Sequence, residues 1–173
     1  MMLSVKSLIR LRVLVLFCMA SLMASCGFTP MHAPAGAAGA FGNMSVELGP
    51  SIQADDKLAA FWVQQRLTER LGSDSGAAQI LEITPTTRRG GIGISGQDVA
   101  TRYDLRLGLG YKLKDAKTGK VLDRGTINSV STYTATNDPY ALIAAEEATT
   151  KQLSSDTADR LLTRLAGYFA SKK

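Results

Sequence analysis

The segment RYDLRLGLGYKLK, residues 102–114, decides the fold, because apolar and charged side chains alternate along most of its length. Successive side chains of a strand point to opposite faces, so this pattern predicts a strand with one buried face and one face in water. The apolar set is Tyr103, Leu105, Leu107, Leu109, Tyr111 and Leu113, and the polar set is Arg102, Asp104, Arg106, Lys112 and Lys114.

The flanking sequence supplies three further strands. DAKTG, residues 115–119, is typical of a hairpin connection, and residues 121–133 are expected to return as the antiparallel partner. Upstream, MSVEL at residues 44–48 alternates and stops at Gly49-Pro50, and residues 79–85 alternate as well. We therefore expect a sheet of four strands.

Two helices are expected beside this sheet. From about Asp55 to Leu71 the apolar residues recur near helical spacing, and Gly72 favours a helix end there; this apolar set is Leu58, Phe61, Trp62, Leu67 and Leu71. In NDP, residues 137–139, Asp138 is the expected cap and Pro139 the first residue of a helix over about 140–170, with a possible break within 149–156. The order β-α-β-β-β-α predicts an α+β fold: a four-stranded, mostly antiparallel sheet with two helices packed on one face.

The N-terminus has the pattern of an export signal. A basic start precedes an apolar run from Val13, and small residues lead to Cys26. The run is shorter than the roughly 20 residues needed to span a bilayer, so a transmembrane anchor is not favoured. We predict a lipoprotein signal at 1–25, lipidation of Cys26 by diacylglycerol and N-acyl groups, a flexible tether at 26–43 and one domain at 44–173.

Much of the net positive charge of the chain comes from residues in this predicted signal. The formal net charge is +5, but Lys6, Arg10 and Arg12 lie in the predicted signal, and their removal lowers it to about +2. A nearly balanced domain does not attract phosphate backbones strongly, so no nucleic-acid partner is expected.

No enzyme is predicted. The only histidine, His32, lies in the predicted tether, so no histidine triad or zinc site is expected in the domain, and no metal or cofactor is predicted. GIGISG at residues 91–96 matches the dinucleotide pattern G-x-G-x-x-G, but no helix is expected to follow it, so we interpret it as a loop between strands. Glu146 and Glu147 are interpreted as part of a solvated helix face.

Basic residues cluster around the predicted second, third and fourth strands, and two interpretations stay open. The cluster is Arg88, Arg89, Arg102, Arg106, Lys112, Lys114, Lys117 and Lys120. It could bind phosphate or carboxylate groups, arginine doing so through two parallel hydrogen bonds. Alternatively it is a solvated sheet face interleaved with Asp104, Asp115 and Asp123.

Four short segments resemble the LPS-assembly lipoprotein family LptE in its alphaproteobacterial form. They are CGFTPM at 26–31, ATRYDL at 100–105, STY at 131–133 and NDPYA at 137–141, in the family's order and behind a lipobox. The resemblance covers essentially the whole chain.

This resemblance implies a non-catalytic partner protein. It implies a small α/β sandwich inside the outer-membrane β-barrel LptD, where the domain acts as a plug, assists barrel assembly and binds lipopolysaccharide. Family contacts with lipopolysaccharide involve basic residues before the long strand and near the start of the last helix. Here the resemblance points to Arg88, Arg89 and Arg102 first and to Lys112 and Lys114 second, whereas the helix start reads AAEE at 144–147.

Gly27 after the cysteine, in place of an acidic residue, favours the periplasmic side of the outer membrane as the destination. The alternative function is an envelope lipoprotein that binds a periplasmic protein or peptidoglycan and has no barrel partner. An envelope hydrolase is disfavoured, because the chain has no G-x-S-x-G elbow.

Overall fold

A computed structural model of the chain describes residues 44–72, 76–94, 100–134 and 137–172. The predicted signal, Cys26 and the tether lie outside these residues. The order of elements is β1 (Met44–Leu48), the 3-10 turn η1 (Ala54–Asp56), α3 (Lys57–Leu71), β2 (Gln79–Ile94), β3 (Ala100–Asp115), β4 (Val121–Thr134) and α4 (Pro139–Ser171). No helix among the described residues is long and apolar enough to cross a membrane.

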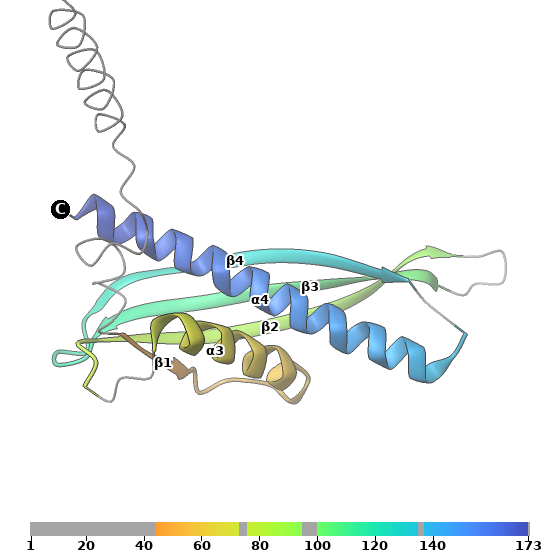
Figure 1. Cartoon of the computed structure of the whole chain (residues 1–173), viewed down its shortest axis with the longest axis horizontal. Coiled ribbons are helices and arrows are strands. Elements are labelled where there is room, and N and C mark those ends of the chain that lie inside the picture. Colours follow the sequence, from red (N-terminus) through yellow and green to blue (C-terminus); the bar gives the residue numbers. More distant parts are fainter. Residues whose placement is uncertain (1–43, 73–75, 95–99, 135–136, 173) are drawn as a thin grey trace, which may run out of the picture.

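The four strands form one sheet in the order β1-β2-β3-β4. β1 runs parallel to β2, and the β2–β3 and β3–β4 pairs are antiparallel. Figure 1 shows α3 and α4 on the same side of long, gently twisted strands, with α4 crossing them obliquely. The predicted α+β fold, mostly antiparallel with two helices on one face, is therefore confirmed.

β3 shows the alternation that the sequence predicts. Its odd-numbered side chains from Leu105 to Leu113 are buried and form the centre of the core together with β2 and the helices. The charged residues at even positions, such as Arg102, Arg106 and Lys112, are exposed on the opposite face. One sheet face is thus covered by helices and the other is open to solvent.

The buried side of α3 includes Leu67 and Leu71 as predicted but differs from the prediction in the first half of the helix. Ala59, Ala60, Val63, Leu67 and Leu71 are its buried residues. The expected core residues Leu58 and Phe61 are 40% and 56% exposed, which corrects the prediction. The buried residues recur close to every fourth position, which places them on one face of the helix. The first of them are small alanines, and the larger Leu58 and Phe61 lie on the outer side.

α4 continues without a break through the polar segment 149–156. The hydroxyls of Thr149, Thr150 and Thr157 donate to the carbonyl oxygens four residues earlier, at 2.7, 2.8 and 2.6 Å. These bonds satisfy the hydroxyls inside the helix and let Thr157 be fully buried. The helix begins as predicted, because the Asp138 carboxylate accepts a hydrogen bond from the Tyr140 N–H at 2.9 Å.

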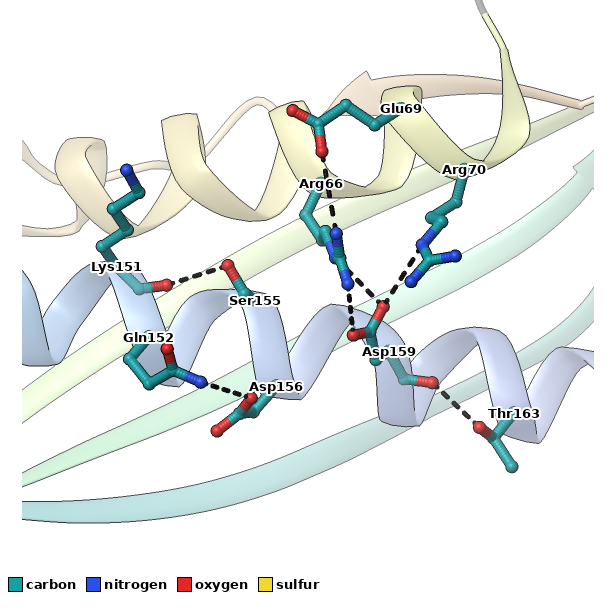
Figure 2. Close-up of polar contacts among 9 residues, drawn as sticks. All are labelled: Arg66, Glu69, Arg70, Lys151, Gln152, Ser155, Asp156, Asp159 and Thr163. Atoms are coloured by element: carbon teal, nitrogen blue, oxygen red, sulfur yellow. Dashed lines mark hydrogen bonds and ion pairs between the residues drawn. The ribbon is translucent and has the colours of Figure 1, made fainter.

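An ion pair joins the two helices (Figure 2). Arg66 of α3 donates from Nε and Nη2 to the two carboxylate oxygens of Asp159 on α4, at 3.1 and 2.8 Å. Arg70 adds a longer contact to Asp159 at 3.9 Å. This two-pronged geometry fixes the rotation of α3 relative to α4 at the surface of the helix layer.

β2 is longer than predicted. The expected strand ended near residue 85, but β2 runs to Ile94, so the segment 91–94 of the GIGISG motif is strand and not loop, and residues 95 and 96 lie outside the described residues. The first half of β3 supplies the missing partners: Gly91 pairs with Tyr103 and Ile92 with Arg102. Pairing with a strong neighbouring strand overrides the weak strand preference of glycine.

The edge of β2 beyond β1 is protected by two different residues. The Ile83 carbonyl points toward β1 and accepts a hydrogen bond from the Gly49 N–H at 2.8 Å. Backbone groups of every second residue in a strand point to the same side, so Pro85 and Thr87 are the next residues whose backbone faces this edge. Pro85 has no N–H to leave unpaired. The Thr87 N–H and hydroxyl both donate to the buried Asp56 carboxylate, at 2.5 and 2.8 Å. Asp56 therefore replaces a strand at this position.

Candidate functional site

The open face of the sheet, which consists of the β2, β3 and β4 side chains turned away from the helices, is the candidate functional surface. Strand alternation and register place basic and acidic residues on it, and the basic ones are in excess. The basic residues are Arg88, Arg102, Arg106, Lys112, Lys114 and Arg124, and the acidic ones are Glu82 and Asp104.

Two glycines in the middle of β3 hollow out this face. Around Gly108 lies a shallow hollow of about 460 Å³, and around Gly110 lies another of about 490 Å³. The neighbouring open-face residues on β2 and β4 are short and polar: Thr84, Thr86, Thr126 and Asn128. The sheet therefore presents a polar trough with cationic side chains at both ends.

At one end of the trough the two lysines share an internal ion-pair partner. Lys112 and Lys114 donate to the two carboxylate oxygens of Glu82, at 3.0 and 2.5 Å. Hydrogen bonds from Lys114 and then Lys112 lower the pKa of the Glu82 carboxyl below its ordinary value. The structure thus brings the two predicted lysines together, but an internal carboxylate occupies them both.

At the other end the arginines are not paired in this way. Arg88 lies directly opposite Arg106 in the β2–β3 register and has no ion pair within the described part of the chain. Arg106 contacts Asp104 only at 3.6 Å, with its side chain 68% exposed. A third arginine, Arg160 of α4, lines the same hollow of about 460 Å³.

The predicted site residues Arg88 and Arg89 separate onto opposite faces, as neighbours in a strand must. Arg89 faces the helix side, donates to Glu146 of α4 at 2.6 Å, and lies 5.3 Å from the centre of the Tyr103 ring. It joins the start of α4 to the sheet. Glu146, interpreted from sequence as solvated, is therefore an ion-pair partner, while Arg102 is exposed on the open face as expected.

Sequence reasoning placed Arg106 in the basic cluster and, by alternation, on the same strand face as Arg102, but it missed Arg124 and Arg160. No local pattern connects Arg160 to a strand residue, because only the packing of α4 on the sheet brings it to the hollow. Within the described ranges, no group of three or more His, Cys, Asp or Glu side chains could hold a metal ion.

Solved structures of lipoproteins share this fold. A candidate lipoprotein from Caulobacter crescentus matches with a TM-score of 0.65 and 24% identity over 80% of this chain and 98% of its own. Rare lipoprotein B from Shewanella oneidensis matches with a TM-score of 0.56 and 18% identity, over 74% and 96%. A minor lipoprotein from Acinetobacter baumannii matches with a TM-score of 0.55 and 16% identity, over 74% and 92%.

No curated protein sequence matches the chain significantly. The family model described as LptE, lipopolysaccharide-assembly, matches residues 50–165, which is more than half of the chain and takes in α3, β2, β3, β4 and most of α4. Three of the four segments that resembled this family in the sequence, at 100–105, 131–133 and 137–141, lie inside the match, and the fourth, at 26–31, lies outside it. The chain belongs to the LptE lipopolysaccharide-assembly family.

Proposed function

We propose that this protein is an outer-membrane lipoprotein that forms a plug-and-assembly complex with the LptD β-barrel and takes part in lipopolysaccharide transport and insertion at the cell surface. The observation that carries the proposal is the family match over residues 50–165, together with a sheet that is covered by helices on one face only. No catalytic step is part of the proposal.

The dimensions of the domain suit a plug. β2 and β3 each contain 16 residues. At about 3.3 Å per residue the sheet is about 50 Å long. The apolar band of an outer-membrane barrel is about 25 Å tall, and the interior of such a barrel is polar. A sheet of this length with a polar open face could fill a wide lumen and still extend beyond one end of it.

Lipopolysaccharide would meet the open face through its phosphates and acidic sugars. Arg88 and Arg102 are the predicted contacts that the structure leaves exposed there without an internal ion pair among the described residues. Lys112 and Lys114 are weaker candidates because Glu82 must release them first. Arg89 serves the interface with α4, so its loss would act on binding only indirectly.

The lipid on Cys26 would hold the domain at the periplasmic side of the outer membrane. Each buried acyl CH₂ contributes about 0.8 kcal/mol to membrane binding, and stable anchoring takes more than one chain. The predicted tether at 26–43 would let the domain reach a partner in the same membrane.

The alternative is an envelope lipoprotein that docks onto a periplasmic protein or peptidoglycan. Its specific support is apolar surface on the helix layer: Leu58, Phe61 and Ile143 are all exposed. Exposed apolar side chains that lie near one another mark protein contacts. A hollow of about 240 Å³ between Leu58 and Ile143 brings two of them together.

A pull-down separates the two functions. The full-length protein, tagged after Lys173, is extracted from its native envelope in mild detergent, and the co-purifying proteins are identified by mass spectrometry. A similarly tagged, unrelated outer-membrane lipoprotein is the control. Near-stoichiometric recovery of a large β-barrel protein with the bait alone is expected. Recovery of intact bait without a barrel would favour the alternative.

A further inference from the structure

We propose that the hollow between Arg88, Arg106 and Arg160 binds a phosphate monoester group. We call it the arginine hollow, and its other lining residues include Thr86, Gly108 and Asn128. The proposal rests on the proposed function in one respect: the phosphate of lipopolysaccharide is the ligand we expect there.

The arrangement of Arg88 and Arg106 is the first argument. The two residues are paired directly across antiparallel strands, where Cβ atoms lie about 5 Å apart, and like charges at such positions repel each other. Both side chains extend from the open face into solvent. A doubly charged anion between them replaces this repulsion by two attractions.

The contrast with the other end of the trough is the second argument. Glu82 lies between two lysines there and binds both. At the arginine end, Asp104 is the nearest acid, and one of its oxygens already accepts a hydrogen bond from the Thr132 hydroxyl at 2.9 Å. Neither Arg88 nor Arg160 has an ion pair within the described ranges. Two of the three arginines that line this hollow therefore have no internal carboxylate partner among the described residues.

The floor of the hollow is the third argument. Gly108 has no side chain, and Thr86 and Asn128 lie opposite it on the two neighbouring strands. The hydroxyl and amide can donate hydrogen bonds to oxygens that the guanidinium groups do not reach. The volume of about 460 Å³ exceeds the need of a bare ion and leaves room for the group that carries the phosphate.

These features select a phosphate carried on a larger molecule. Arginine binds phosphate through two parallel hydrogen bonds, and three arginines, one each from β2, β3 and α4, line the hollow. A phosphorylated sugar could place its phosphate between the guanidinium groups and its ring over Gly108. Such a group can belong to a lipid headgroup or to a soluble phosphate ester, and the shared chemistry is the phosphate monoester.

Binding to the full-length protein, purified in detergent, tests the proposal. The probes are phosphorylated lipid A in the same detergent, the same lipid A after enzymatic dephosphorylation, and inorganic phosphate as a competitor. We expect the phosphorylated lipid to bind at least tenfold more tightly than the dephosphorylated one. If millimolar inorganic phosphate displaces the lipid, a soluble phosphate is sufficient to occupy the hollow. If inorganic phosphate does not displace the lipid, the ligand is the phosphate carried on the lipid.

Two kinds of variant locate the site. The double variant Arg88→Gln/Arg106→Gln and the single variant Arg160→Gln remove charge, and Lys57→Gln, at an exposed position of α3 outside the open face, is the control for loss of one positive charge. Gly108→Val fills the arginine hollow, whereas Gly110→Val fills only the neighbouring hollow; an added Cβ would come no closer than 3.4 Å to other atoms at either glycine. We expect the double arginine variant and Gly108→Val to lose at least tenfold in affinity, and both controls to stay within twofold of the wild type.

Two results would overturn the proposal: equal binding of phosphorylated and dephosphorylated lipid, or unchanged binding by both the double arginine variant and Gly108→Val. The circular dichroism spectrum and the pull-down are recorded for every variant, so that misfolding is recognised. A variant that recovers the barrel but not the phosphate preference separates the hollow from the plug. Conversely, a wild-type protein that prefers the phosphorylated lipid but recovers no barrel would contradict the proposed function and leave the hollow supported.

Discussion

Replacement of Asp56 by alanine tests how the free edge of β2 is held in place. Asp56 is 5% exposed, and its carboxylate accepts two hydrogen bonds from Thr87, at 2.5 and 2.8 Å. Hydrogen bonds to a charged group contribute about 1.5–3 kcal/mol each, and a buried donor left unpaired costs about 1–3 kcal/mol. Water can reach an edge strand and recover part of this loss, so we expect the free energy of unfolding to fall by about 2 kcal/mol.

Urea unfolding followed by circular dichroism measures this change. For a domain of this size, about 2 kcal/mol corresponds to a fall in Tm of about 8 °C. Asp56→Asn is the matched control, because its amide oxygen still accepts both hydrogen bonds without the charge, and about half of the loss is expected. Hydrogen exchange at the Thr87 amide should accelerate more in Asp56→Ala than in Asp56→Asn. A loss below about 0.5 kcal/mol, or equal effects of the two variants, would refute the assignment of Asp56 as an edge cap.

Three further predictions concern the helix layer, the lysine end of the trough and the anchor. Asp159→Ala breaks the interhelical ion pair, whose partners are partly exposed, so a loss of about 0.5–1 kcal/mol that shrinks in high salt is expected in urea titrations; a salt-independent loss would mean that the ion pair is not its cause. Glu82 has a folded-state pKa lowered by Lys114 and Lys112, so its contribution to stability is present above the unfolded pKa of about 4.3 and disappears as the pH falls through the lower folded value. Glu82→Gln should therefore flatten the dependence of stability on pH in this acidic range, and an unchanged profile would contradict the pairing. Cys26→Ala should abolish incorporation of labelled palmitate and release much of the protein from the membrane fraction; undiminished labelling would exclude Cys26 as the lipid site.

The sequence predicts those parts of the fold that local patterns determine. Strict alternation in residues 102–114 gave the long central strand and its buried face, and β1 has the predicted bounds, 44–48. The cap at Asp138 and the helix end at Gly72, where φ is +83°, also follow from residue chemistry. In each case the signal lies within a few neighbouring residues.

The parts that sequence reasoning got wrong depend on contacts between distant segments. Glycines at 90, 91 and 93 predict a loop, but pairing with β3 extends β2 through them. The large apolar residues Leu58 and Phe61 suggest a buried face, whereas the close packing of α3 favours alanine at that face. Thr149 and its polar neighbours suggest a break in α4, but their hydroxyls bond within the helix.

In the candidate site, too, local patterns predict some placements, whereas others depend on contacts between distant segments. Alternation places Arg102 and Arg106 together on the open face, and it also separates Arg88 from Arg89, a distinction that their adjacency in sequence conceals. The pairing of Lys112 with Glu82 depends on the β2–β3 register, which no single segment determines. Arg160 is brought in by the helix layer and has no local signal at all.

The most direct test of a role in lipopolysaccharide export is depletion of the protein in its native cells. Newly made lipopolysaccharide is pulse-labelled, and its amounts in the inner membrane, the outer membrane and the accessible cell surface are measured as the protein declines. We expect surface lipopolysaccharide to fall and the inner-membrane pool to grow, with restoration by the wild-type gene. Undiminished delivery of labelled lipopolysaccharide to the surface after full depletion would contradict the account.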